Sequence, residues 1–245
     1  MAVDPLPTAV FAIPGFCQPV SSLSHLAAAG AACVFALPLL RLGRRRGGHR
    51  TAIAVYVACV IAVLVVSGTY HSLNRGGSAR AMMQQVDYYA IWLLIAGTFT
   101  AVHGIMCRGF WRRGVLTFVW GYAAVGISLQ VIWFDIFSGV PGLIMYLGLG
   151  WVGIASVIKL GRQIGFRAVR PLWTAGIAFS AGAILEAVQQ PNLMRGWIGP
   201  HEIFHLAVIL GVAMHWLFIR GLLLNHVQMN VQVAPDAAPV VVPAC

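Results

Sequence analysis

Two pairs of chemically capable side chains stand four residues apart within strongly apolar stretches. Ser67 and His71 form the first pair, and His201 and His205 form the second. Side chains at i and i+4 lie on one face of a helix. Two histidines at that spacing, joined by a third from a facing helix, suit a tetrahedral zinc site with an open fourth position. This pattern makes His71, His201 and His205 candidate ligands of a zinc ion (Zn2+).

Asp87 opens the third apolar stretch, and Glu186 lies near the end of the sixth. Where such stretches cross a membrane, an ionisable group costs at least ~2.5 kcal/mol at mid-bilayer, so each one is a functional candidate. Asp87 is a candidate to hold or deprotonate a zinc-bound water, or else a helix N-cap. Ser67 would donate to that water or to a developing oxyanion, or else bond to its own helix. Glu186 either has a role at the site or is an interfacial carboxylate.

The second histidine pair also forms a literal HExxH motif, His201-Glu-Ile-Phe-His205. In metalloproteases this motif supplies two zinc ligands and a glutamate base. Glu202 points about 100° away from its flanking histidines on a helix, and no motif for a further acidic ligand is evident. A metalloprotease is therefore the second candidate enzyme. Hydrogen bonds to neighbouring helices are predicted for the other histidines of the apolar stretches, His25, His103 and His215.

The composition identifies the elements that must position these groups. Of the 245 residues, 60% are hydrophobic and 9% are charged, against about 25% charged in soluble domains. This excludes a soluble globule and a disordered chain, and predicts an integral membrane protein. The net charge of +10 comes from arginines that lie between apolar runs, so it indicates membrane orientation rather than nucleic-acid binding. The five cysteines show no paired spacing and are interpreted as small apolar residues.

A membrane helix needs about 20 mostly apolar residues. Seven stretches qualify: 22–42, 51–72, 86–106, 115–134, 140–158, 171–190 and 201–224. The predicted fold is all-α, with one seven-helix transmembrane domain at 22–224, an N-terminal segment at 1–21 and a poorly ordered tail at 225–245. In an alternating bundle, six polar groups then fall on one membrane face: Ser67, His71, Asp87, Glu186, His201 and His205.

The loop arginines predict the orientation of the bundle. The loops after the first, third and fifth stretches, together with Arg220, hold 13 of the basic residues, and the other side holds Arg75, Arg80 and Arg195. Cytoplasmic loops carry the excess of Lys and Arg. The count predicts a cell inner or plasma membrane protein with its N-terminus outside, its C-terminus in the cytoplasm and the six polar groups on the outer side.

The chain resembles the hemolysin III and progestin/adiponectin receptor family of seven-helix membrane proteins. The resemblance lies in Ser67-Gly-Thr-Tyr-His71-Ser, Asp87-Tyr-Tyr-Ala-Ile-Trp-Leu-Leu-Ile-Ala-Gly-Thr-Phe-Thr and Gly199-Pro-His201-Glu-Ile-Phe-His205, with Gln18-Pro-Val-Ser-Ser-Leu-Ser-His25 similar to the opening helix. It covers about residues 18–220. It implies zinc held by His71, His201 and His205, with Ser67 and Asp87 orienting or activating the zinc-bound water.

The resemblance also implies a lipid substrate. The adiponectin receptors and the related alkaline ceramidases are linked to hydrolysis of ceramide-type amides, while hemolysin III is named for a proposed pore-forming activity. This chain departs from the bacterial pattern at Tyr88-Tyr89, usually His-Ser, at Ala101, usually Pro, and at Glu186, often Tyr. In the adiponectin receptors the zinc faces the cytoplasm, whereas the arginine count places it outside here.

Besides the metalloprotease, the sequence leaves three functions open. The first is zinc-dependent hydrolysis of a membrane lipid amide or ester, with a ceramide-like substrate and Asp87 as general base. The second is a receptor-like protein in which zinc is structural. The third is a pore or membrane-perturbing protein. Membrane lipids are the predicted partners in each case, and no feature of the sequence indicates an oligomeric state.

Overall fold

The structure is a computed structural model that describes residues 10–44 and 49–232. Its helices are α1 (Pro19–Arg44), α2 (Arg50–Ser72), α3 (Ser78–Met106), α4 (Gly109–Ile132), α5 (Phe134–Phe137), α6 (Val140–Ile164), α7 (Arg170–Val188) and α8 (Pro200–Gln232). All but the four-residue α5 are long and apolar enough to cross a membrane. The prediction of an all-α, seven-helix membrane protein is confirmed.

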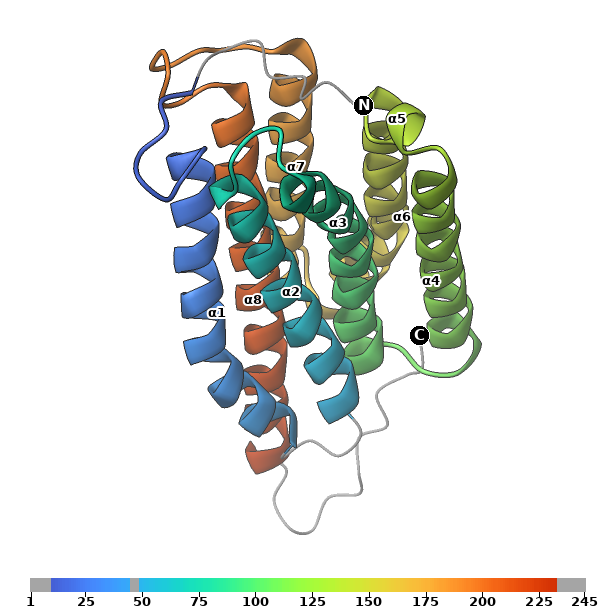
Figure 1. The fold of residues 1–245 in the computed structure, drawn as a ribbon. Helices are drawn as coiled ribbons and strands as arrows, with labels where there is room; N and C mark the ends of the chain where they lie inside the picture. Colours follow the sequence, from blue (N-terminus) through green and yellow to red (C-terminus); the bar gives the residue numbers. More distant parts are fainter. Residues whose placement is uncertain (1–9, 45–48, 233–245) are drawn as a thin grey trace.

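The seven long helices alternate in direction and form one bundle (Figure 1). Helix α2 packs against α1 and α3, and α8 packs against α7 and α1. Helices α4 and α6 lie on the far side of α3, joined by the short α5. The end of α2, the beginning of α3, the end of α7 and the beginning of α8 therefore meet at one end of the bundle, the upper end in Figure 1.

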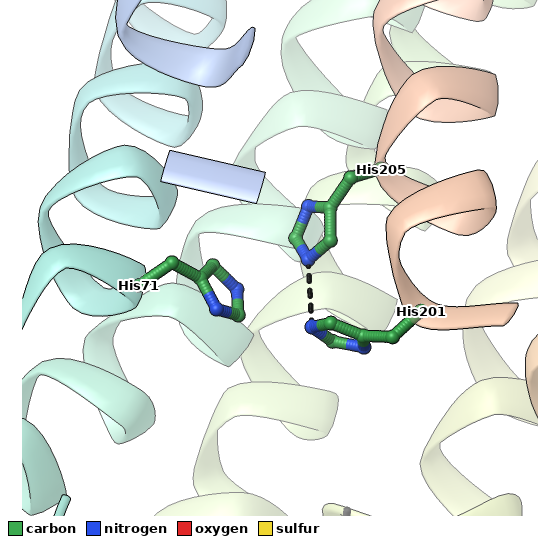
Figure 2. Close-up of side chains that lie close together, drawn as sticks. All are labelled: His71, His201 and His205. Carbon is green, nitrogen blue, oxygen red and sulfur yellow. Dashed lines mark hydrogen bonds between the residues drawn. The ribbon is translucent and has the colours of Figure 1, made fainter. Parts of the chain in front are cut away.

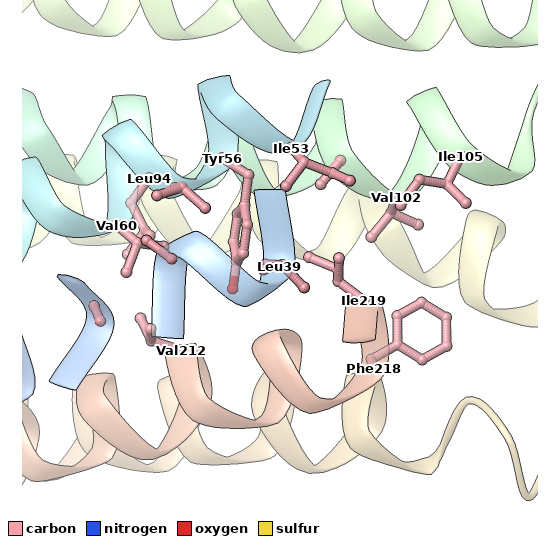
Figure 3. Close-up of a cluster of buried hydrophobic side chains, with 14 of the residues drawn as sticks. Leu39, Ile53, Tyr56, Val60, Leu94, Val102, Ile105, Val212, Phe218 and Ile219 are labelled. Carbon is pink, nitrogen blue, oxygen red and sulfur yellow. The ribbon is translucent and has the colours of Figure 1, made fainter. Parts of the chain in front are cut away.

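Two apolar clusters hold the helices together. The larger cluster joins α1, α2, α3 and α8 and includes Leu39, Tyr56 and Ile219 (Figure 3). The smaller cluster joins α3 to α4 and α6 around Trp92, which is fully buried. Gly126 of α4 packs directly on the Trp92 ring, because a Cβ at that position would overlap the indole. Small residues let membrane helices approach closely, where no hydrophobic drive between helices exists.

The outer surface of the bundle is apolar. Large side chains such as Val34, Val131 and Ile144 are each more than 60% exposed. A soluble protein rarely exposes so many large apolar groups. A bilayer solvates them, which agrees with the membrane location inferred from composition.

Four helix bounds differ by six residues or more from those predicted from hydropathy. Helix α4 begins at Gly109 rather than Val115, and α6 ends at Ile164 rather than Ile158. Helix α3 begins at Ser78 rather than at Val86, because its first turns carry polar residues that a hydropathy window does not count. Helix α8 continues to Gln232, past the predicted end at Leu224, so residues 225–232 of the predicted tail are helical, while residues 233–245 lie outside the described part. The division into segments 1–21, 22–224 and 225–245 otherwise stays a prediction.

Candidate metal centre

The three candidate histidines lie together at the upper end of the bundle. His71 comes from the last turn of α2, and His201 and His205 come from the first two turns of α8 (Figure 2). One ring nitrogen of each lies within 4.8 Å of the others. Nε2 of His201 and Nε2 of His205 are 2.9 Å apart. The structure thus brings together the set that the sequence pattern singled out.

Each of these histidines has a partner for its other ring nitrogen, Nδ1. His71 Nδ1 lies 2.7 Å from Oε1 of Gln18, and His201 Nδ1 lies 3.2 Å from Oε1 of Glu186. His205 Nδ1 lies 3.2 Å from Nε2 of His25, a nitrogen that can accept a proton. Histidines that bind metals almost always donate their second N–H to such an outer partner. All three Nε2 atoms are therefore left to face the centre of the cluster.

The Nε2 atoms fit a metal ion better than they fit each other. Nε2 of His71 is buried and has no hydrogen-bond partner. The 2.9 Å contact between His201 and His205 requires a proton or a cation between the two nitrogens, because two lone pairs repel. Nitrogens ~2.0–2.1 Å from zinc at tetrahedral angles lie roughly 3.3 Å apart. The observed separations, from 2.9 Å to at most 4.8 Å, bracket that value.

Asp87 and Ser67 lie beside the histidines from two further helix positions. Asp87 is buried in α3, and the side chain of Ser67 on α2 donates a hydrogen bond to its carboxylate. The Asp87 carboxylate also interacts electrostatically with His201. Asp87 follows the start of α3 by nine residues, so its alternative interpretation as a helix N-cap is wrong. The structure leaves it available as a proton acceptor.

The beginning of α1 presents a polar stripe to this cluster. Gln18, Ser21, Ser22 and His25 stand at positions i, i+3, i+4 and i+7, and each is at most 1% exposed. That spacing is one face of a helix. Gln18 contacts His71 and His25 contacts His205, while Ser22 Oγ donates to the carbonyl of Gly68 at 2.7 Å. The beginning of α1 supplies no candidate ligand itself, but its side chains contact two of the three candidate ligands, His71 and His205.

Comparison with known proteins shows which family has this sequence. A model of the family described as "Haemolysin-III related" matches residues 18–216, which include the α1 stripe and all three histidines. The chain belongs to the haemolysin-III-related family. It is 28% identical over 163 residues to a protein named Hemolysin-3 from Bacillus cereus, covering 66% of this chain and 71% of that one. It is 25% identical over 159 residues to a Hemolysin-3 homolog from Bacillus subtilis (strain 168), covering 65% and 71%.

In this haemolysin-III-related chain, an apolar cavity of about 230 Å³ adjoins the polar cluster. Ser67, Asp87 and His205 line it, and it continues between α3, α6, α7 and α8. Along α3 the lining runs from Asp87 to His103, which is about 24 Å of helix at 1.5 Å per residue. The cavity is therefore long, apolar and polar at the end where the histidines meet.

Both carboxylate oxygens of Glu202, the glutamate of the HExxH motif, have partners other than the histidines. Glu202 is 2% exposed, and its Oε2 accepts a hydrogen bond from the backbone N–H of Gly199 at 2.9 Å. Its Oε1 accepts one from the hydroxyl of Ser21 at 3.4 Å. Glu202 thus caps the start of α8 and fastens it to α1. A general base for a metalloprotease would need a free carboxylate oxygen, and both oxygens of Glu202 have partners outside the histidine cluster.

The remaining histidines of the membrane-spanning helices, His103 and His215, have ordinary structural partners. Nε2 of His103 lies 2.9 Å from Oγ of Ser156 on α6, as predicted for a bond between helices. His215 instead donates from Nδ1 to the carbonyl of Gly211 on its own helix, so the prediction of an interhelical bond is wrong there. The four cysteines of the described chain have free thiols, in agreement with their interpretation as small apolar residues.

Sequence reasoning did not assign the outer partners of the ligands. The spacing assigns no role to Gln18 or Arg80 and leaves two roles open for Glu186. The hydrogen bond to a neighbouring helix predicted for His25 is confirmed, with His205 of α8 as its partner. The i, i+3, i+4, i+7 spacing of polar residues in an otherwise apolar helix was the signal for the α1 stripe. No comparable signal exists for Arg80, which was counted as a loop arginine but is 5% exposed.

Proposed function

We propose that this protein is a zinc-dependent membrane hydrolase that cleaves a lipid amide or ester of the ceramide type. The observation that supports this most directly is the set of three Nε2 atoms facing one another beside a buried carboxylate at the polar end of an apolar cavity. His71, His201 and His205 would hold the ion. Zinc in such a three-histidine site supplies Lewis acidity and makes water a usable nucleophile at neutral pH.

The remaining residues supply proton transfer and position. Asp87 would accept a proton from the attacking water and deliver it to the leaving amine or alcohol, as a general base and then a general acid. Ser67 holds the Asp87 carboxylate by a hydrogen bond and fixes its direction. Burial keeps bulk water from competing for this carboxylate.

The cavity supports a lipid substrate. Its lining runs for about 24 Å along α3 and is mostly apolar between Asp87 and His103, and Asp87 and His205 lie at the end near the cluster. A long acyl chain would lie along the walls and bring its amide or ester carbonyl to the histidines. Ligand sites are usually apolar cavities with a few placed polar groups, as here.

Three other functions were open from the sequence, and the first two, a pore and a metalloprotease, have less support. The relatives are named for hemolysis, but a pore needs a continuous polar path, and the described cavity is apolar over most of its length. A metalloprotease would use Glu202 as its base, and Glu202 is committed to Gly199 and Ser21. A receptor with structural zinc uses the same three histidines and differs only in whether Asp87 is needed.

The proposal is tested by metal analysis of the full chain purified in detergent, paired with hydrolysis of a long-chain N-acyl sphingosine followed by mass spectrometry. We expect one zinc per chain, and loss of both zinc and activity in His205→Ala. His215→Ala is the matched control for metal content, because it removes a histidine from the same helix outside the cluster. Full activity in a metal-free protein would contradict the proposal.

The orientation is proposed on the arginine distribution alone. Arg80 is buried at the upper end of the bundle, so the exposed loop arginines of that end reduce to Arg75 and Arg195. The positive-inside rule then puts the histidine cluster on the outer side of the membrane and the end of α8 in the cytoplasm.

A further inference from the structure

Arg80 reaches the candidate metal centre through one intermediate side chain. It lies in the first turns of α3 and is 5% exposed. Its NH1 group donates to the backbone carbonyls of Tyr70 at 3.2 Å and Leu73 at 2.8 Å, and its guanidinium lies 4.6 Å from the centre of the Tyr70 ring. Its NH2 group donates to Oε1 of Gln18 at 2.7 Å. The fork of the guanidinium thus joins the end of α2 to the entry of α1.

The contact with Arg80 determines which end of the Gln18 amide faces His71. A guanidinium can only donate, so the atom of Gln18 that it contacts must be the oxygen. The same oxygen lies 2.7 Å from Nδ1 of His71, which therefore carries the proton and donates it. Neutral imidazole has one N–H and one lone pair. The lone pair of His71 is thereby placed on Nε2, the buried atom that faces His201 and His205.

We infer that Arg80 is a positioning residue that sets the tautomer of His71 through Gln18. The inference rests on the proposed zinc site, because only a metal ligand needs that lone pair. Without Arg80 the amide of Gln18 is free to turn over and offer its NH2 group to Nδ1. His71 would then carry its proton on Nε2, where it would have to be displaced before a metal could bind.

A merely structural role for Arg80 would produce a different result. Its bonds to Tyr70 and Leu73 also fasten the last turn of α2, so any substitution will lower thermal stability. Gln18→Glu separates the two roles. A carboxylate has an acceptor at both ends, so it needs no arginine to select the end that faces His71. Gln18→Met has a similar length and no acceptor at all.

The test is the zinc affinity of the full chain in detergent, measured by competition with a chromophoric chelator, with thermal stability recorded for every variant. Outer-shell substitutions typically lower metal affinity 10–100-fold. We expect a loss on the order of that range in Gln18→Met and in Arg80→Met. We expect no further loss when Arg80→Met is added to Gln18→Met, and restored affinity when it is added to Gln18→Glu.

The outcomes separate this inference from the proposed function. If the wild type binds no zinc, or if His71→Ala binds it equally well, the proposed zinc site is wrong. If zinc binding depends on His71 but Arg80→Met leaves affinity unchanged, or lowers it as much with Gln18→Glu as without, then the positioning role is wrong and the zinc site stands. Should Arg80→Met fail to fold, Arg80→Gln serves in the same cross, because an amide both donates and accepts and so no longer requires the oxygen of Gln18 to face it.

Discussion

Asp87→Asn distinguishes a hydrolase from a protein in which zinc is structural. Asparagine has nearly the same shape, and its side-chain oxygen can still accept the hydrogen bond of Ser67. It also contributes none of the three nitrogens of the cluster. We therefore expect the variant to fold and to keep one zinc per chain. What it loses is the negative charge and, with it, a group able to take up a proton.

The size of the effect follows from that single change. General acid–base catalysis by a positioned side chain contributes about 10²–10⁴-fold, which is roughly 2.7–5.5 kcal/mol at 1.36 kcal/mol per factor of ten. The turnover of N-acyl sphingosine by Asp87→Asn should fall by that factor at unchanged zinc content, with both measured on one preparation. Turnover within tenfold of the wild type would refute a general base at Asp87. Loss of zinc together with activity would show that Asp87 holds the metal instead.

Three further predictions concern the outer partners, the fold and the orientation. Glu186→Gln replaces the charged acceptor of His201 Nδ1 with a neutral one, so we expect zinc affinity to fall by about tenfold in chelator competition; an unchanged affinity would remove Glu186 from the site. Gln130 accepts from Trp92 Nε1 and donates to the hydroxyl of Tyr146 and the carbonyl of Phe137. At about 0.6–1.7 kcal/mol per bond in a membrane protein, Gln130→Leu should lower the free energy of unfolding in detergent by about 2–5 kcal/mol. A decrease below ~0.5 kcal/mol would mean that other contacts replace these bonds. A green fluorescent protein fused after the last residue should fluoresce in a bacterial host, because the C-terminus is predicted to be cytoplasmic; a dark but full-length fusion would reverse the orientation.

The helices could be predicted because hydropathy alone determines where a chain crosses a membrane. Each of the seven predicted stretches overlaps one long helix of the structure. The first turns of α3 lie outside the predicted stretch for the same reason, since Ser78 to Gln85 include a serine, an arginine and two glutamines and so fall outside the apolar window. Arg80 lies in those turns. A buried arginine is indistinguishable from a loop arginine in sequence, because its burial depends on the carbonyls of Tyr70 and Leu73 at the end of another helix.

The candidate ligands could be predicted because their spacing carries the information. His201 and His205 share a helix face, and alternation of the helices places His71 at the same membrane depth. Their partners are harder to predict because nothing in the spacing pairs them. Glu186 meets His201 across the α7–α8 packing, and the distance of 3.2 Å depends on how closely those two helices approach. Among these partners, only the polar residues of the α1 stripe follow a spacing that predicts one helix face.

That stripe connects the stability of the fold to the chemistry of the site. Between membrane helices there is no hydrophobic drive, so packing and hydrogen bonds must hold α1 in place. Its buried polar groups find their partners on α2 and α8: Gln18 with His71, Ser21 with Glu202, Ser22 with Gly68 and His25 with His205. The contacts that dock α1 are therefore the same contacts that orient two of the three histidines. A substitution in the stripe should weaken metal binding and helix packing together, whereas a substitution in the apolar core near Leu39 should weaken packing alone.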